Sequence, residues 1–279
     1  MRTVEELTQS GLEVIHFAFI HRAVQMAPMF SGGHDSLCAT HIASQHPEFT
    51  GDVHHIDTGI GASYTRNFVE GVCNRFGWCL VVHKSKDTFE KFVRERGFPG
   101  PGAHGWVYNR LKGRCVQEIV KGRKKTLLIT GCRQQESVRR MGHVQPLKIG
   151  ETSKKTGKVQ HYSQIWTSPC YDWSKAEQQL YMDEMGLPIN KMKIAVGMSL
   201  ECCCGAFAQP GEIELLREHA PDVATEIQRL SCIARECGKH CIWGSRPSKQ
   251  GGASVAETGP MCSSCDLRAA ASGLIIIQN

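Results

Sequence analysis

The sequence predicts an α/β fold: a doubly wound, mostly parallel sheet covered by helices, followed by a cysteine-rich, metal-binding C-terminal appendage. Three observations lead to this prediction. Short apolar runs alternate with helical patterns through the first 190 residues. A glycine-rich turn, SGGHDS, separates the first apolar run from the helix that follows it. Of the 14 cysteines, the last eight lie between Cys202 and Cys265. Strand–helix alternation is typical of parallel sheets with helices on both faces.

The first half of the sheet comes from two strand–helix units. We predict strands over residues 25–30 and 52–57, each a short β-like run followed by a turn. Helices over residues 35–45 and 64–76 follow them. Crossover helices of this length connect parallel strands, so the two strands should lie side by side.

Two more strands are predicted over residues 78–82 and 126–130, with helical segments over 87–96 and 106–121 between them. In open α/β sheets, ligands bind at the carboxyl ends of the strands. The residues that follow each predicted strand are therefore the candidates for a binding site.

After the fourth strand the pattern changes. Two alternating runs between residues 145 and 166 flank ETSKKTGK, which predicts a hairpin with a basic tip. A helix over 174–185 ends before Gly186 and Pro188, and one further helix covers about 210–235. We place a domain boundary near residue 195, which gives a sheet domain over 1–195 and a cysteine-rich region over 196–279.

Composition excludes several classes of protein. The chain has 279 residues, of which 41% are hydrophobic and 22% charged, as in globular proteins. Its longest apolar runs, such as residues 274–277, are too short to cross a bilayer, and the polar start MRTVEELTQSGLE is no signal peptide. We therefore expect a cytoplasmic protein without a membrane partner. A net charge of +6 suits an anionic ligand.

The turn SGGHDS is a candidate phosphate-binding loop. Two adjacent glycines let the backbone approach an anion, and the following helix offers free N–H groups. The serine hydroxyls are additional donors, and Asp35 could orient the loop or help to hold Mg²⁺. The kinase-type loop is excluded because no GK[ST] follows. The alternative is a simple turn whose serine caps the helix. The loop residues are Ser31, Gly32, Gly33, His34, Asp35 and Ser36.

Three further segments accompany this loop in order. HIDTG stands at 55–59, GCRQQESVRR at 131–140, and a segment ending in SPCYDW at 168–173. With SGGHDS, they resemble the SGGxDS, H-x-D-T-G, G-x-R-x-x-E-S-x-x-R and P-I-x-D-W motifs of the ATP pyrophosphatase superfamily, in its phosphoadenosine-phosphosulfate (PAPS) reductase-like branch. One departure is IGASYT at 60–65, where relatives often carry an aromatic-Pro-Glu-Thr run.

The resemblance implies an adenine nucleotide alpha hydrolase-like domain over 1–195 that binds ATP and Mg²⁺. Asp35, Asp57, Arg133 and Arg140 would be catalytic. From spacing alone, Asp57 could equally belong to a plain turn, and the arginines could form ion pairs on an exposed helix. The other implied nucleotide-binding residues outside the loop are Thr58, Gly59, Gly131 and Glu136.

The C-terminal cysteines form a candidate metal site. Cys202 and Cys204, with the distant Cys262 and Cys265, supply four thiolates, enough for a tetrahedral zinc or an iron–sulfur cubane. Unrelated buried cysteines are the alternative. Spacing does not separate zinc from iron. The resemblance favours a [4Fe-4S] cluster, since members of this branch hold one with a cysteine pair and a distant CxxC. Cys203 and Cys241 are possible substitutes.

Cys237 is a second kind of candidate. The run ECGKH at 236–240 resembles the E-C-G-x-H segment whose cysteine attacks sulfur in sulfonucleotide reductases. In those enzymes the segment ends the chain, whereas here it precedes the CxxC. We expect a packed or ligating thiol more than a nucleophile.

Three functions are compatible with these motifs. The first is an ATP-dependent adenylylating enzyme that releases pyrophosphate and activates a substrate for sulfur transfer, as in DNA phosphorothioation or, elsewhere in the superfamily, tRNA thiolation. Its partners would include a sulfur donor such as a cysteine desulfurase, and other modification proteins. The second is an adenylyl-sulfate or PAPS reductase that makes sulfite through Cys237. The third is a metal-stabilised nucleic-acid-binding protein. The intact loop favours the first.

Overall fold

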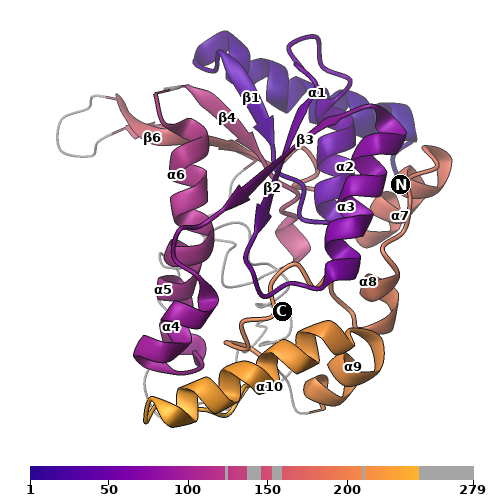
Figure 1. Cartoon of the computed structure of the whole chain (residues 1–279). Coiled ribbons are helices and arrows are strands. Elements are labelled where there is room, and N and C mark those ends of the chain that lie inside the picture. Colours follow the sequence, from indigo (N-terminus) through magenta and orange to yellow (C-terminus); the bar gives the residue numbers. More distant parts are fainter. Residues whose placement is uncertain (123–124, 137–145, 153–158, 209–210, 245–279) are drawn as a thin grey trace.

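The computed structural model describes residues 1–122, 125–136, 146–152, 159–208 and 211–244, and side chains are described except at 136, 149–152 and 159–163. A mixed sheet lies at the centre (Figure 1). Strand β1 (Gln25–Pro28) pairs in parallel with β4 (Thr126–Ile129), and β4 pairs in parallel with β6 (Val159–Thr167). At the edge, β5 (Leu147–Thr152) runs antiparallel to β6, which confirms the hairpin. Its tip lies outside the described residues.

The other half of the sheet is the parallel pair of β2 (Asp52–Asp57) and β3 (Cys79–Lys84). A parallel bridge between Met29 and His54 sets β2 beside the end of β1. The strand order is therefore β3-β2-β1-β4-β6-β5, which reverses direction at β1. This confirms a doubly wound, mostly parallel α/β fold.

One face of the sheet carries most of the helices and the largest apolar core. Leu7, Leu37, Val69 and the fully buried Trp173 belong to this core. Its helices are α1 (Val4–His21), α2 (His34–Ala43), α3 (Ser63–Phe76) and α7 (Lys175–Glu184).

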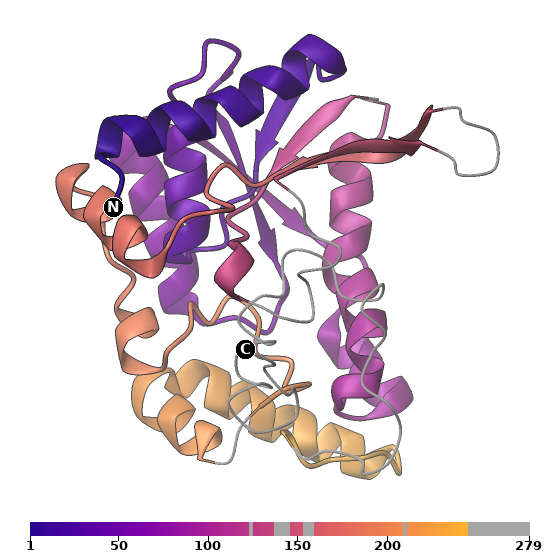
Figure 2. The same ribbon diagram turned by 180° about the vertical axis from the view of Figure 1, so that it is seen from behind.

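Helix α6 (Arg114–Val120) covers the opposite face, as the reverse view shows (Figure 2). Val116 and Ile119 of this helix pack against Met29 and Leu128 from the central strands. Apolar residues on both sides of β1 and β4 explain why these short strands are mostly apolar after their first residues, Gln25 and Thr126.

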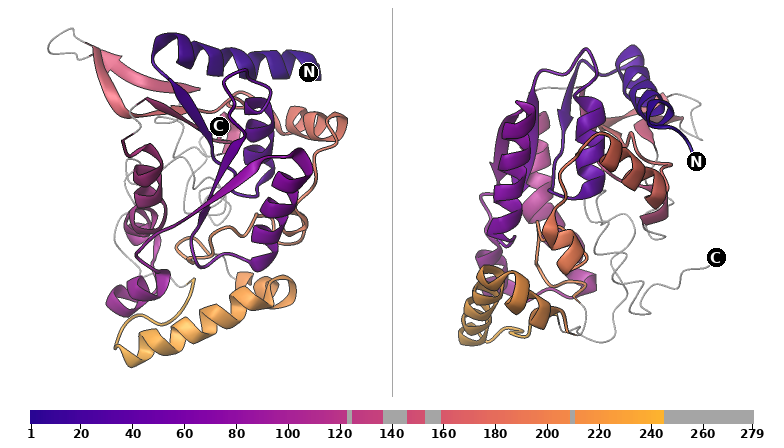
Figure 3. Two further views of the ribbon diagram at one scale, coloured as in Figure 1. Left: turned by 45° about the horizontal axis from the view of Figure 1, so that its top comes forward. Right: turned by 90° about the vertical axis from the view of Figure 1, so that its right-hand side faces the viewer.

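A second core lies beyond the carboxyl ends of the strands, where α9 and α10 cross below the sheet (Figure 3). Phe92, Leu111, Leu200 and Ile227 meet there. The cysteine-rich segment thus shares a core with the helices that follow β3. The elements are α4 (Phe89–Arg96), η1 (Pro101–Ala103), α5 (His104–Tyr108), the π-helix η2 (Asn109–Gly113), α9 (Glu212–His219) and α10 (Pro221–Glu236).

Several elements differ from the prediction. Helix α1 was not expected, although Thr3 and Glu6 form a capping box at its start. The single helix predicted over 210–235 is wrong: α9 ends at His219 and α10 begins at Pro221, because proline fits the first turn of a helix but not its interior. The short helices α8 (Lys191–Ala195) and η3 (Gln134–Glu136) were also not expected. Within the described residues, no helix combines the length and hydropathy needed to span a membrane.

Candidate functional site

The SGGHDS loop leaves the end of β1 and starts helix α2. Gly32 has a φ of +81°, a conformation that suits glycine, and an added Cβ would lie 2.7 Å from Thr65. The Ser31 N–H donates to the Ser36 hydroxyl at 3.2 Å, and that hydroxyl donates to the Gly33 carbonyl at 2.9 Å. These bonds curl the loop around the start of α2, with the helix N–H groups facing the turn.

Three hydroxyls surround the open face of Gly33. A Cβ on this residue would lie 3.6 Å from the Ser31 oxygen, 3.7 Å from that of Ser36 and 3.9 Å from that of Ser199. The three atoms nearest to the space above Gly33 are thus hydroxyl oxygens that can donate hydrogen bonds, an arrangement that suits an anion. Ser199 was missed from the sequence, because only the fold brings it to this loop.

A nearly buried ion pair stabilises the part of the loop that begins helix α2. The Arg133 guanidinium donates to Asp35 Oδ1, and the Gln178 amide donates to the same oxygen. The side chains of Arg133 and Asp35 are only 10% and 16% exposed. Gly131 is required here, since an added Cβ would lie 2.2 Å from the Asp35 carbonyl carbon and from the Ser36 nitrogen. Two sequence-predicted residues, Asp35 and Arg133, therefore meet each other.

Of the two other predicted site residues in the GCRQQESVRR motif, the structure describes one. Glu136 lies in η3, directly after the Arg133 turn. Arg140 lies outside the described residues, so its predicted pairing with Arg133 at a phosphate stays a prediction.

Asp57 is the last residue of β2, and both of its carboxylate oxygens have bonding partners. One oxygen accepts from the Gly59 N–H at 2.9 Å, and the other lies 3.1 Å from both Arg66 and Lys84. Burial raises the pKa of Asp57, but the Gly59 N–H and the two cations outweigh it, so its pKa is lowered. Asp57 is ionised at neutral pH and holds two exposed cations at the edge of the sheet.

The cysteine segment, residues 200–204, is hydrogen-bonded to the loop that follows β2. Thr58 donates its hydroxyl to the Glu201 carbonyl at 2.9 Å. The Ala62 N–H donates to the Leu200 carbonyl, and the Cys203 N–H to the Ile60 carbonyl, each at 2.9 Å. The thiols that follow residue 201 therefore lie beside the predicted nucleotide motif, although 143 residues separate Thr58 from Glu201.

The three adjacent cysteines make different contacts. The Cys202 thiol interacts with Cys204, and this contact, with the charge of Lys112, lowers the pKa of the partly exposed Cys202 thiol. Cys203 makes a different contact, with its sulfur 4.0 Å from the Leu200 carbonyl. Cys202 and Cys204 thus form an interacting pair of sulfur donors, whereas Cys203 contacts the backbone.

A buried ion pair fixes this segment to the π-helix η2. Lys112 Nζ lies 2.6 Å from Glu201 Oε2, and the two side chains are 5% and 8% exposed. The other carboxylate oxygen, Oε1, is buried and accepts no hydrogen bond from the residues that the structure describes. π-Helical turns are often found at functional sites.

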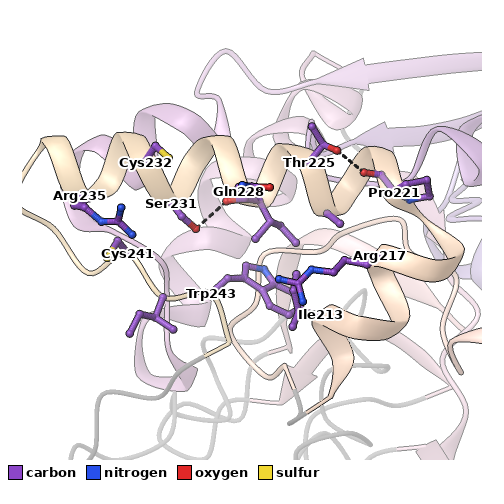
Figure 4. Close-up of a pocket in the computed structure, with 13 residues that line it drawn as sticks. Ile213, Arg217, Pro221, Thr225, Gln228, Ser231, Cys232, Arg235, Cys241 and Trp243 are labelled. Atoms are coloured by element: carbon purple, nitrogen blue, oxygen red, sulfur yellow. Dashed lines mark hydrogen bonds between the residues drawn. The ribbon is translucent and has the colours of Figure 1, made fainter.

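The remaining cysteines lie elsewhere. Cys237 is exposed at the end of α10 and contacts Arg94 of α4, so the structure does not bring it to the phosphate loop. Cys241 and Cys232 line a groove of about 660 Å³ between α9, α10 and residues 241–243 (Figure 4). Trp243, in the wall of that groove, donates to the Cys203 carbonyl at 2.9 Å. The chain therefore passes beside the cysteine segment just before residue 245.

The complete metal site cannot be assembled from the described residues. Cys262 and Cys265 lie outside them, and in the described part no three His, Cys, Asp or Glu side chains converge on one point. The Cys202–Cys204 pair has the soft sulfur donors that zinc and iron–sulfur clusters require.

Solved structures to which the chain is similar include a PAPS reductase from Candida auris, at 18% identity and a TM-score of 0.47, covering 68% of this chain and 88% of that one. A second is an NH3-dependent NAD synthetase from Campylobacter jejuni, at 12% identity and a TM-score of 0.48, covering 90% and 100%. A third is an FMN adenylyltransferase from Candida glabrata, at 11% identity and a TM-score of 0.45, covering 70% and 63%.

An uncharacterised protein of Methanocaldococcus jannaschii is 29% identical over 173 residues, which are 61% of this chain and 39% of that protein. The chain therefore spans well under half the length of this relative. The model of the phosphoadenosine phosphosulfate reductase domain matches residues 25–200, from the first residue of β1 to the start of the cysteine segment. This range contains the phosphate loop, Asp57, the Asp35–Arg133 pair and Ser199. The chain belongs to the phosphoadenosine phosphosulfate reductase domain family.

Proposed function

We propose that this protein is an ATP-dependent adenylylating enzyme that activates a substrate for sulfur transfer. The observation that carries the proposal is the Thr58–Glu201 contact, which joins the loop after β2 to the cysteine segment. A phosphate-binding loop and a thiol pair at one edge of the sheet would let activation and sulfur delivery occur in one site.

The first step would be transfer of the adenylyl group. An oxygen of the acceptor attacks the α-phosphorus of ATP, the bond between that phosphorus and the β-phosphate bridging oxygen breaks, and pyrophosphate leaves with the electron pair. Ser31, Ser36 and the backbone of Gly33 would hold the β- and γ-phosphates with Mg²⁺. Such a reaction depends mainly on positioning and charge neutralisation.

The Asp35–Arg133 pair would act by positioning. Arg133 and Gln178 neutralise and fix the Asp35 carboxylate, and Asp35 belongs to the first turn of α2. The pair therefore fixes the helix N–H groups that face the phosphates. Asp57, with Arg66 and Lys84, would bind the nucleotide at the next strand.

The second step would replace AMP by sulfur on the activated acceptor. We propose that the acceptor is a nucleic acid, with DNA phosphorothioation as the favoured case and tRNA thiolation as the other. The sulfur would come from a donor such as a cysteine desulfurase, working with other modification proteins. The net charge of +6 supports an anionic acceptor.

We further propose a [4Fe-4S] cluster held by Cys202, Cys204, Cys262 and Cys265, with zinc as the alternative. The orientation of the cysteine pair supports the choice of Cys202 and Cys204 over Cys203. When bound, a cluster would supply electron transfer or a sulfur-binding iron. Trp243, near the end of the described chain, supports this choice because it is bonded to the carbonyl of Cys203, between the two proposed ligands.

The reaction products test the proposal. Anaerobically purified protein is incubated with radiolabelled ATP, Mg²⁺ and either a DNA or a tRNA acceptor, and the nucleotides are separated. AMP and pyrophosphate are expected. ADP and orthophosphate would reject an adenylylating enzyme, and sulfite from adenylyl sulfate in the absence of ATP would identify a reductase.

A further inference from the structure

The phosphate loop brings no cation of its own. SGGHDS contains neither lysine nor arginine, and the nearby Arg133 is bonded to Asp35. A bound triphosphate carries several negative charges, and proteins that bind one commonly supply a lysine or arginine directly to the phosphates. We therefore searched the segments around the loop for a cation.

The segment that begins with Asn190 is hydrogen-bonded to the SGGHDS loop. Asn190 is fully buried, and its side-chain amide donates to the Gly32 carbonyl at 2.9 Å. The amide oxygen accepts from the Met192 N–H at 2.9 Å, and the Asn190 carbonyl accepts from the Lys193 N–H at 3.0 Å. One asparagine thus holds the first turn of α8 against Gly32.

Lys193 stands on this turn beside the loop. Burial lowers the pKa of His34, and the positive charge of Lys193 lowers it further, so the Lys193 charge acts on a residue of the loop. In the described part of the chain, no carboxylate lies within ion-pairing distance of Lys193. Lys191, two residues earlier, is exposed to solvent.

The same segment returns to the loop at Ser199. Its hydroxyl is one of the three that surround Gly33, and its carbonyl accepts a hydrogen bond from Thr65. Residues 190–199 therefore contact the loop at both of its glycines.

We infer that Lys193 and Ser199 form the second half of the phosphate site, with the Lys193 ammonium on the β- and γ-phosphates and the Ser199 hydroxyl on the phosphate above Gly33. The inference rests on the proposed function and adds the residues that recognise a nucleotide carrying a terminal pyrophosphate. AMP lacks the groups that Lys193 would hold.

Titration calorimetry of the full chain with inorganic pyrophosphate, MgATP and AMP tests this inference. Lys193→Met should weaken pyrophosphate and ATP binding about tenfold or more, since hydrogen bonds to charged groups contribute strongly. AMP binding should change by less than about twofold, because only the distal contacts are lost. Lys193→Arg should keep most of the affinity, and Ser199→Ala should lose part of it. Lys191→Met, on the same turn, is the matched control and should bind all three ligands normally.

The outcomes separate the inference from the proposed function. If Lys193→Met, folded as judged by its thermal transition, binds pyrophosphate like the wild type while Ser36→Ala does not, the loop is a phosphate site and Lys193 has no part in it. If the wild-type protein binds neither pyrophosphate nor ATP, both the inference and the proposed function are wrong.

Discussion

The hydroxyl of Thr58 donates a 2.9 Å hydrogen bond to the carbonyl oxygen of Glu201. Thr58 follows β2 in the predicted nucleotide motif, and Glu201 immediately precedes the three cysteines. Two backbone bonds, from Ala62 to Leu200 and from Cys203 to Ile60, extend this contact. The cysteine segment is therefore part of the edge of the sheet where the phosphate loop lies.

Gly61 should be intolerant of any side chain, because it lies at the centre of this contact. An added Cβ would lie 2.4 Å from the Glu201 carbonyl oxygen, which is backbone and cannot rotate away. Gly61→Ala should therefore lower the free energy of unfolding by about 1 to 3 kcal/mol, as measured by urea denaturation. Gly71→Ala, in α3 with no atom near its Cβ, is the control and should be neutral or stabilising. Equal stability of the two variants would contradict the contact.

Gly33→Ala should separate binding from folding. Its Cβ would meet the Ser31, Ser36 and Ser199 hydroxyls at ordinary contact distances, so the thermal transition should stay unchanged. The methyl group would, however, occupy the space where a phosphate belongs, and affinity for pyrophosphate should fall about tenfold or more.

Gly32→Ala provides the contrast. With a φ of +81° and a Thr65 methyl at 2.7 Å, it should lose stability as well as binding. Normal pyrophosphate binding by Gly33→Ala would mean that the phosphates lie elsewhere.

Removing one charge of the Lys112–Glu201 ion pair should destabilise the fold more than removing both. Lys112→Met leaves the Glu201 carboxylate buried without its cation, which should cost about 3 to 5 kcal/mol of unfolding free energy. The double variant Lys112→Met/Glu201→Leu removes both charges and keeps the Glu201 backbone contacts, so most of the stability should return. Urea denaturation of the single and double variants measures the difference. A double variant no more stable than Lys112→Met would show that the charge pairing is unimportant.

Metal content should distinguish the three adjacent cysteines. Cys202→Ala and Cys204→Ala should lose iron, because their sulfurs lie together, whereas Cys203→Ala should keep about four irons per chain. Iron and zinc analysis of anaerobically purified variants checks this. Zinc without iron in the wild type would keep the ligands and exclude the cluster, and loss of iron only in Cys203→Ala would reverse the assignment.

Local sequence signals predicted most of the sheet domain. Strand β2 has its predicted bounds, and β1, β3 and β4 differ by at most two residues at either end. These strands are short β-like runs followed by turns or helical patterns, so both ends are visible in the sequence. The same rules should have given α1 from its Thr3–Glu6 capping box and should have divided the helix at Pro221.

The partners within the site could not be predicted in this way. Gln178 reaches Asp35 from a helix 143 residues away, and Asn190 reaches Gly32 from 158 residues away. Ser199 resembles any other serine until the chain folds back on the loop. Arg133 was expected to face a phosphate, and its bond to Asp35 depends on how closely Gly131 approaches α2. Such contacts are set by tertiary packing and leave no periodic pattern.

The central claim is that nucleotide loop and cysteine segment form one site, and protection of Cys202 from alkylation measures it most directly. Metal is removed with a chelator, the protein is treated with iodoacetamide with and without saturating MgATP, and each cysteine is followed by mass spectrometry. Cys202 is partly exposed, while Cys79 and Cys237 are exposed and serve as internal controls. The account predicts that MgATP slows alkylation of Cys202 but not of the two controls, and that Gly33→Ala abolishes this protection. Alkylation of Cys202 at the same rate with and without MgATP would contradict it.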